Sequence, residues 1–220
     1  MQKYALIVAG GSGSRMRSEL PKQFMPILGK PILMHTLKAF HFDGIQLILV
    51  LPKKQISFWQ ELCQKNAFFI PHTVVEGGNT RFESVQNGLN SLKSEEGLVA
   101  IHDGVRPIIK KQLIRSAFQE AATNGNAIAS VALKDSIRKV EGDTNSAEDR
   151  AAYRLIQTPQ TFQIERIKRA FQLATHKEFT DDAAVLEAMG ERIHLIDGDY
   201  RNIKITTPED LLVAETYLDA

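Results

Sequence analysis

A short apolar run that ends abruptly in glycine constrains this chain more than any other feature. Residues 5–9 are entirely apolar, and three glycines fall within the next four positions. A brief apolar run bounded by glycine is typical of a strand buried inside a parallel sheet. Glycine lets the backbone approach a ligand closely, and successive N–H groups can then point at one anion. Because the cations Arg15 and Lys22 come next, this stretch predicts a phosphate-binding loop.

Two common phosphate-binding motifs do not fit this loop. The dinucleotide fingerprint G-x-G-x-x-G needs a third glycine where Met16 stands. The P-loop needs a lysine directly after its second glycine, whereas Lys22 lies well beyond the glycines and is followed by Gln23. The sequence therefore predicts a third kind of loop and disfavours a dehydrogenase.

The amino-acid composition limits the classes of protein to which this chain can belong. The chain has 220 residues, 43% of them hydrophobic, and a formal net charge of +1. This suits one domain, residues 1–220, with enough apolar side chains for a core, and gives no basis for a nucleic-acid partner. Cys63 is the single cysteine, which excludes an intrachain disulfide and suits a reducing compartment. The apolar runs are too short for a signal peptide or for the ~20 residues of a membrane span, so we expect a soluble cytoplasmic protein.

Apolar runs alternate with helical patterns along the chain. This alternation predicts an α/β fold with a mostly parallel sheet and helices on both faces. Pro71 makes its strand either an edge strand or a broken one, because proline cannot donate to a ladder. The expected strands are 5–9, 46–51, 68–75, 98–101, 127–133, 192–196 and 202–206, and the expected helices begin near 31, 56, 81, 113, 163, 182 and 208.

Residues 134–156 differ in character from the rest. They predict a protruding β-hairpin around the polar turn 141–146, with little apolar content of its own. A two-stranded hairpin is marginal by itself. We therefore predict that this arm packs on another subunit.

Two further stretches carry candidate site residues. Thr80 is a candidate cap for the helix that follows it, which would place Arg81 and Ser84 near outward-pointing N–H groups that can read a base edge. Asp103 ends an apolar strand, where open α/β sheets bind ligands. It can hold Mg²⁺ or a ribose hydroxyl, or it can merely form the turn before Gly104. His102 beside it is expected to be structural.

Separated motifs in uninterrupted order give the chain a family resemblance, and they are residues 9–16, 21–23, 78–81, 84–85, 102–107, 157–160, 180–182 and 202–206. It resembles the 2-C-methyl-D-erythritol 4-phosphate cytidylyltransferases. The resemblance implies a Rossmann-like nucleotidyltransferase domain and a transfer from CTP to the polyol phosphate with release of pyrophosphate. It also implies Mg²⁺ and a homodimer with exchanged arms.

The same resemblance assigns roles to individual residues. Arg15 and Lys22 are expected to stabilise charge on the CTP phosphates, while Arg150 and Lys204 hold the phosphate of the acceptor. Residues that would surround cytosine and phosphates are Ala9, Gly10, Gly11, Gly13, Gly78, Asn79, Ser84, Asp103 and Gly104; those that would complete the acceptor pocket are Arg106, Ser136, Thr158 and Thr180. The chain departs from the common family pattern at Val8, Gly10, Gly104, Val105 and Ser136, with changes that keep small size or a hydroxyl.

The residue types fit this chemistry. A phosphate monoester is already largely ionised near neutral pH, so its attack needs no general base. Positioning and cations then supply most of the catalysis, and no His/Cys cluster suggests zinc. Two alternatives stay open: a ribitol 5-phosphate cytidylyltransferase, which shares several motifs, and a catalytically silent nucleotide-binding regulator. Residues 102–107 and 179–182 favour the methylerythritol branch.

Overall fold

The first predicted strand lies in the middle of the sheet. The computed structural model describes residues 1–11 and 20–219. Strand β1 (Lys3–Val8) pairs in parallel with β4 (Gln46–Leu51) on one side and with β6 (Leu98–Asp103) on the other. The strand order is β11-β7-β10-β6-β1-β4-β5, and β5 (Thr73–Glu76) is an edge strand as predicted, although it begins later than expected.

The other half of the sheet contains its antiparallel member. Strand β10 (Arg154–Gln163) runs antiparallel between β6 and β7 (Asn126–Ala132), and β11 (Leu195–Asp197) is parallel to β7. The pairing of β10 with β7 breaks between Ile156 and Gln160. This break contains Pro159, which has no N–H for a ladder, so a proline is accommodated in a central strand. The mostly parallel sheet is confirmed.

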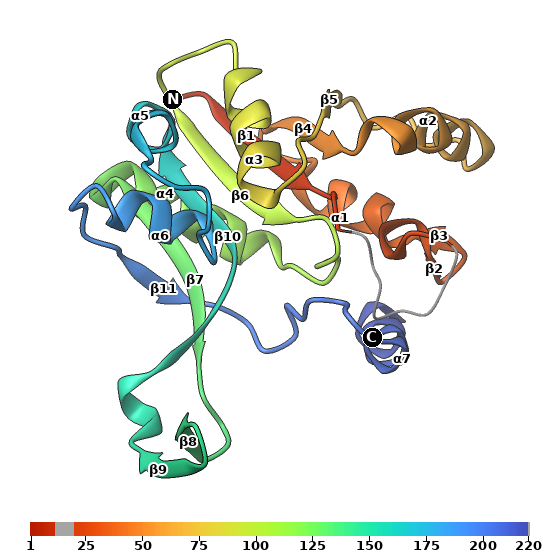
Figure 1. Ribbon diagram of the computed structural model, residues 1–220. Coiled ribbons are helices and arrows are strands. Elements are labelled where there is room, and N and C mark those ends of the chain that lie inside the picture. The colour runs from red at the N-terminus through yellow and green to blue at the C-terminus, as the bar shows by residue number, and fades with distance from the viewer. Residues whose placement is uncertain (12–19, 220) are drawn as a thin grey trace.

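Helices cover both faces of the sheet, as the alternation predicts (Figure 1). Side chains alternate along β1, so that Ala5 and Ile7 face one helical layer while Leu6 and Val8 face the other. The first layer holds α1 (Ile32–Phe40), α2 (Ile56–Lys65) and α4 (Lys111–Asn124), and the second holds α3 (Arg81–Asn90), α5 (Ile164–Leu173) and α6 (Asp182–Glu187).

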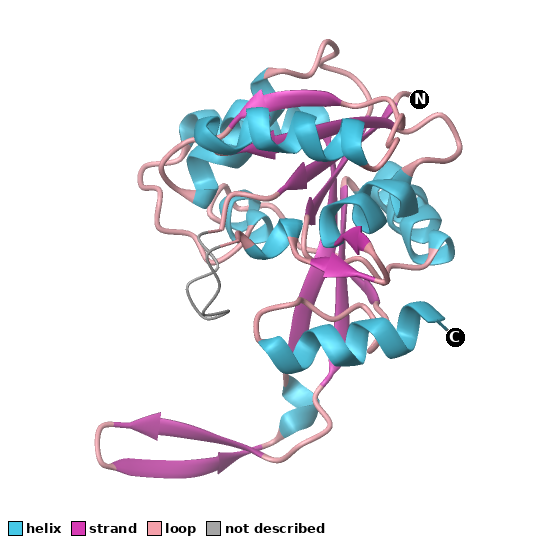
Figure 2. Ribbon diagram, turned by 90° about the vertical axis from the view of Figure 1, so that its right-hand side faces the viewer, coloured by secondary structure: helices cyan, strands magenta, loops and turns pink. Residues whose placement is uncertain are grey.

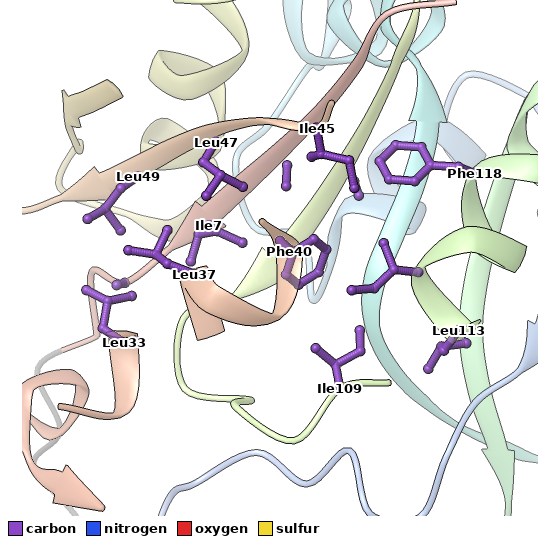
Figure 3. Close-up of a cluster of buried hydrophobic side chains, with 14 of the residues drawn as sticks. Ile7, Leu33, Leu37, Phe40, Ile45, Leu47, Leu49, Ile109, Leu113 and Phe118 are labelled. Carbon is purple, nitrogen blue, oxygen red and sulfur yellow. The ribbon is translucent and has the colours of Figure 1, made fainter. Parts of the chain in front are cut away.

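The first layer forms a dense apolar cluster (Figure 3). Leu37 and Phe40 of α1 are fully buried against Ile7 and Leu49 of the sheet. Burial of one such side chain contributes about 1.5–3 kcal/mol. Gly125 closes α4 with a φ of 88°, the left-handed conformation that glycine adopts at a helix end. The sheet therefore gives the loops at its carboxyl edge a rigid base.

A smaller cluster fixes the C-terminal part of the chain. Helix α7 (Pro208–Asp219) contributes Ala214, which packs with Ile27, Val105 and Ile205. The strand expected at 202–206 is absent from this described segment, which is a loop. The N–H of Ile205 bonds to the Val105 carbonyl, and the Asn202 side chain donates to the Thr158 carbonyl, so single contacts replace a ladder. Short elements nearby are β2 (Pro26–Ile27), β3 (Lys30–Pro31) and the 3-10 turns η2 (Lys22–Phe24) and η3 (Lys53–Gln55).

The arm extends away from the body (Figure 2). Strands β8 (Ile137–Glu141) and β9 (Thr144–Glu148) form a separate two-stranded sheet, which confirms the hairpin. The hairpin is shorter than the stretch 134–156 predicted for it: its turn is confined to residues 142–143, η4 (Arg150–Ala152) is a 3-10 turn, and Arg154 already belongs to β10. Among the described helices, none is long and apolar enough to cross a membrane.

Candidate active site

Strands β1 and β6 end side by side at one edge of the sheet (Figure 1). The residues around these two strand ends line a pocket. Its walls come from the glycine loop, from the turn before α3 and from the end of β6. This is the edge where parallel α/β sheets bind ligands. We call it the first pocket, and its lining residues are Val8, Ala9, Gly10, Gly11, Lys22, Gln23, Gly78, Asn79, Thr80, Arg81, Ser84, Asp103, Val105 and Lys204.

The start of the glycine loop, up to Gly11, is held in place by buried side chains of the body. Buried Gln23 donates from Nε2 to the Ala9 carbonyl at 2.9 Å and to Gln55 Oε1 at 2.7 Å. Lys22, only 9% exposed, donates to the Ile205 carbonyl at 3.3 Å. These bonds fix a lysine ammonium beside Gly11 in a largely water-excluded wall.

The turn before α3 forms the opposite wall. Thr80 caps the helix as predicted, since its side-chain oxygen accepts the Glu83 N–H at 3.1 Å. Ser84 Oγ accepts the Gly78 N–H and donates to the Thr80 carbonyl. A Cβ at Gly78 would lie 2.2 Å from the Glu83 Cβ, so only glycine fits there. The turn is therefore rigid before any ligand binds.

Asp103 is the electrostatic centre of the site. Its Oδ2 lies 3.1 Å from Arg106 Nε and 3.1 Å from Lys204 Nζ. Burial alone would raise the pKa of this carboxyl, but Lys204, Arg106 and Arg81 together hold it well below its ordinary range. Asp103 is therefore an anion that gathers three cations around itself.

A second pocket adjoins the first. The two share Arg81, Asp103 and Lys204, so these three side chains form a common wall. The remaining lining residues of the second pocket are Arg106, Ile156, Gln157, Thr158, Gln160, Thr180 and Asp181.

Thr158 and His102 support this wall from inside the sheet. His102 Nε2 lies 3.1 Å from the Arg106 carbonyl, which can only accept, so Nε2 carries the proton and Nδ1 accepts from the Thr158 hydroxyl at 3.0 Å. Thr158 Oγ1 in turn accepts the Asp103 N–H at 3.1 Å. Burial lowers the pKa of His102 to about 4, so the ring is neutral. His102 thus has the structural position expected of it, and the Thr158 proton points inward.

The structure brings most of the sequence-predicted residues together, but not all. Arg150 and Ser136 are exposed on or beside the arm and line neither pocket; Arg150 donates to the Lys134 carbonyl. Gly13 and Arg15 lie outside the described residues. Gly104 packs under the loop, where its Cβ position would lie 2.8 Å from the Ala9 Cβ.

Known proteins with the same fold and sequence pattern were found by three comparisons. The family model for 2-C-methyl-D-erythritol 4-phosphate cytidylyltransferase matches residues 4–220. The chain belongs to this family. A relative of that name from Bacteroides fragilis is 49% identical over 99% of this chain and 100% of its own length, and one from Bacteroides thetaiotaomicron is 46% identical over the same shares.

Solved structures agree with this assignment. The 4-diphosphocytidyl-2C-methyl-D-erythritol synthase of Anaerococcus prevotii superposes with a TM-score of 0.85 at 30% identity, covering 100% of this chain and 96% of that one. The cytidylyltransferase of Thermus thermophilus superposes with a TM-score of 0.83 at 29% identity, covering 100% of both chains. The α/β cytidylyltransferase fold expected from the sequence is confirmed.

Sequence reasoning gave no individual role to Gln23 or Asp182, and it placed Arg81 only beside a turn that can read a base edge, although all three shape this cytidylyltransferase site. Gln23 ties the glycine loop to the body, Arg81 lines both pockets, and Asp182 pairs with Arg81 through two hydrogen bonds. Gln23, Arg81 and Asp182 all stand inside motifs noted in the sequence, so their positions were a usable signal. The pairing with Asp182, 101 positions away in the chain, was not visible.

Proposed function

We propose that the chain transfers the cytidylyl group of CTP to 2-C-methyl-D-erythritol 4-phosphate, giving 4-diphosphocytidyl-2-C-methyl-D-erythritol and pyrophosphate. Family membership over almost the whole chain supports this reaction. The observation that carries it is the pair of adjoining pockets with a common cationic wall, since the reaction must hold two anionic substrates in contact.

The first pocket is proposed to bind CTP. Ala9 and the glycine loop, including Gly10, Gly11 and Gly13, would cradle the triphosphate with backbone N–H groups. The turn with Gly78, Asn79 and Ser84, together with Asp103 and Gly104, would enclose the cytidine. Lys22 and Arg15 would stabilise the negative charge that develops during transfer.

The second pocket is proposed to bind the acceptor. Arg106, Lys204 and Thr180 offer cationic and hydroxyl groups to a phosphate monoester. Thr158 contributes indirectly, because its hydroxyl proton is used by His102 and its oxygen orients the Asp103 backbone.

The proposed chemistry is an in-line displacement. An oxygen of the acceptor phosphate forms a bond to the α-phosphorus of CTP, and the bond from that phosphorus to the oxygen bridging to the β-phosphate breaks. Pyrophosphate leaves with the electron pair of that bond. No proton has to be removed from the nucleophile near neutral pH. Positioning of the substrates by the shared wall and stabilisation of negative charge by Lys22 and Arg15 are then the main contributions to catalysis.

Magnesium fits this site through Asp103. Both of its ion pairs use Oδ2, which leaves Oδ1 for a cation. Mg²⁺ is commonly held by one or two carboxylates, water and substrate phosphates, and it would supply charge neutralisation to the triphosphate. Within the described residues no cluster of three His, Cys, Asp or Glu side chains offers a larger metal site.

The arm is proposed to complete the acceptor site of a second copy. Arg150 and Ser136 lie outside both pockets of their own chain. Val140 of the hairpin is 70% exposed, and Leu155, at the start of β10, is 53% exposed. A hairpin with exposed apolar side chains needs a partner surface. We therefore infer a homodimer with exchanged arms, acting in the cytoplasm.

Pyrophosphate release tests the proposal. The purified chain is incubated with CTP, Mg²⁺ and either 2-C-methyl-D-erythritol 4-phosphate or ribitol 5-phosphate. We expect rapid release with the first acceptor and at least a hundredfold lower kcat/KM with the second. Preference for ribitol 5-phosphate would overturn the acceptor assignment, and CTP binding without turnover on either acceptor would overturn the proposed reaction.

A further inference from the structure

Arg81 occupies a place that the assigned roles leave unexplained. It is the first residue of α3 and one of the three side chains shared by both pockets. Its guanidinium binds Asp182 in a bidentate pair, with Nη1 2.7 Å from Oδ1 and Nη2 2.6 Å from Oδ2. The Asp182 side chain is 1% exposed, whereas that of Arg81 is 34% exposed. The pair therefore joins a buried carboxylate to a guanidinium that is partly exposed.

Asp182 is itself held rigidly. It begins α6, whose cap is Asp181, with Oδ1 accepting the Ala184 N–H at 2.9 Å. Gln160 of β10 donates to Asp181 Oδ2 at 2.9 Å and accepts the Ala183 N–H at 2.8 Å. These bonds fix the start of α6 to the sheet, so the Asp182 carboxylate is a stationary support for the guanidinium.

The guanidinium of Arg81 has N–H donors that the pair with Asp182 does not use. It carries five N–H groups, and the bidentate pair uses two. Within residues 1–11 and 20–219, no other acceptor bonds to Arg81. Although burial disfavours its charge, Asp182, with Asp103 and Asp181, raises the pKa of Arg81 above its ordinary range, so the group stays charged. A charged fork with three available donors lies where an acceptor phosphate in the second pocket would meet a triphosphate in the first.

We propose that Arg81 is a further substrate-binding residue, whose N–H groups bind phosphate oxygens at the boundary of the two pockets, and that Asp182 is a positioning residue that orients it. This inference rests on the proposed function for the identity of the phosphates. An arginine suits this place and a lysine does not, because the planar fork can bind a carboxylate on one edge and a phosphate on another.

Four variants test the two roles. In Arg81→Gln we expect kcat/KM for the polyol phosphate to fall about tenfold to a hundredfold, the loss typical of a charge-assisted hydrogen bond, and CTP affinity to fall at least threefold. Arg81→Lys should recover less than a third of the lost activity. Asp182→Asn should cost about tenfold in the wild-type background. It should cost less than twofold in the Arg81→Gln background, because its effect passes through Arg81.

Controls separate these roles from a purely structural one. Arg81→Gln leaves a buried carboxylate unpaired, so the double variant Arg81→Gln/Asp182→Asn provides a chain with two neutral amides there. All assays run well below the lowest thermal midpoint of the set. Arg166→Gln, which breaks an ion pair of 2.9 Å with Glu191 outside both pockets, should change kcat/KM by less than twofold.

Specific outcomes would overturn the inference. A double variant with wild-type kcat/KM for both substrates would exclude a contact between Arg81 and phosphate. An equal loss for Asp182→Asn in both backgrounds would exclude the positioning role. If the wild-type chain released no pyrophosphate at all, the proposed function would fail separately, and calorimetric CTP affinity of wild type against Arg81→Gln would still decide whether Arg81 binds phosphate.

Discussion

In the wall between the two pockets the charged side chains are paired around a buried carboxylate, whereas those of the arm face solvent. Asp103 is 7% exposed and lies 3.1 Å from two cations. On the arm, the ion pair of Lys139 with Glu141 joins side chains that are 59% and 66% exposed. Such surface pairs contribute about 0–1 kcal/mol. The wall is thus preorganised by its own chain, while little within the arm fixes its position.

The apolar side chains of the two regions also differ in burial: they are buried beside the wall and exposed on the arm. Ile101 of β6, beside the wall, is fully buried, whereas Val140 of the arm is 70% exposed. A chain that completes one region internally and leaves the other uncovered is expected to use a second copy for the uncovered one. The comparison therefore predicts that changes in the wall act within one subunit and that changes in the arm act on the neighbouring one.

The largest expected effect lies in the wall of the first pocket. Lys22→Ala should lower kcat by about two orders of magnitude or more, because a preorganised donor to the transition state is lost. Steady-state kinetics of pyrophosphate release measures this. Lys30→Ala, at an exposed position in β3, is the matched control and should retain wild-type kcat. Arg15→Ala carries the same expectation as Lys22→Ala. Unchanged turnover in Lys22→Ala would refute its assigned role.

The arm should respond in a different kinetic parameter. Arg150→Ala is expected to raise KM for the polyol phosphate about tenfold with a smaller effect on kcat, the pattern of lost uniform binding. The control is Arg138→Ala on the same arm, whose guanidinium bonds to Asn145 within the hairpin. Equal effects of the two substitutions would show that Arg150 has no specific contact with substrate.

Mixed dimers test the comparison directly. Subunits carrying Arg150→Ala are combined with subunits carrying Lys22→Ala, and activity is measured after exchange. With exchanged arms, one site of each mixed dimer receives both damaged residues and the other receives neither. Activity should then return to a level set by the fraction of intact sites. If no activity returns, each arm serves its own subunit or none.

The wall and the arm also differ in how far the sequence predicted them. The apolar run before Gly10 and the polar stretch 141–146 are local signals. The strand and the hairpin both formed, although the turn occupies only residues 142–143 and β9 already begins at Thr144. The loop at 202–206 alternates like a strand, yet Asn202 and Ile205 bond singly to Thr158 and Val105. Contacts of this kind join residues tens of positions apart in the chain, so they cannot be predicted from the local periodicity of the sequence. The pairing of Arg81 with Asp182 was invisible for the same reason.

The buried neutral imidazole of His102, which supports the wall, should make stability depend on pH. The folded pKa of His102 is about 4, below its ordinary value near 6.5. Between these values the unfolded chain binds a proton that the folded chain does not, so stability falls as pH drops from 6.5 to 4, by up to about 1.4 kcal/mol per pH unit. Burial also lowers the pKa of His35, which adds in the same direction.

Urea unfolding at several pH values measures this slope. In His102→Gln the slope between pH 4.5 and 6.5 should decrease, whatever the absolute stability of the variant. Residues 134–156 contain no histidine, so the arm contributes no histidine titration to the slope. A slope that is the same in His102→Gln and wild type would place the pH dependence elsewhere in the body.

The smallest expected effect comes from two threonines in matched roles. Thr80 caps α3 at the rim of the first pocket, and Thr144 donates to the Glu141 carbonyl in the hairpin turn. Both are exposed, so their substitution removes little packing. Thr80→Ala should destabilise the chain by about 1 kcal/mol, because the Glu83 N–H loses its acceptor. Thr144→Ala should stay within about 0.5 kcal/mol of wild type. The cap also supports the turn proposed to hold cytidine, so Thr80→Ala should raise KM for CTP a few-fold while Thr144→Ala leaves it unchanged. Equal effects on KM would mean that the turn keeps its shape without the cap, and the rigidity of the wall would then have to come from Ser84 and its bonds to Gly78 and Thr80.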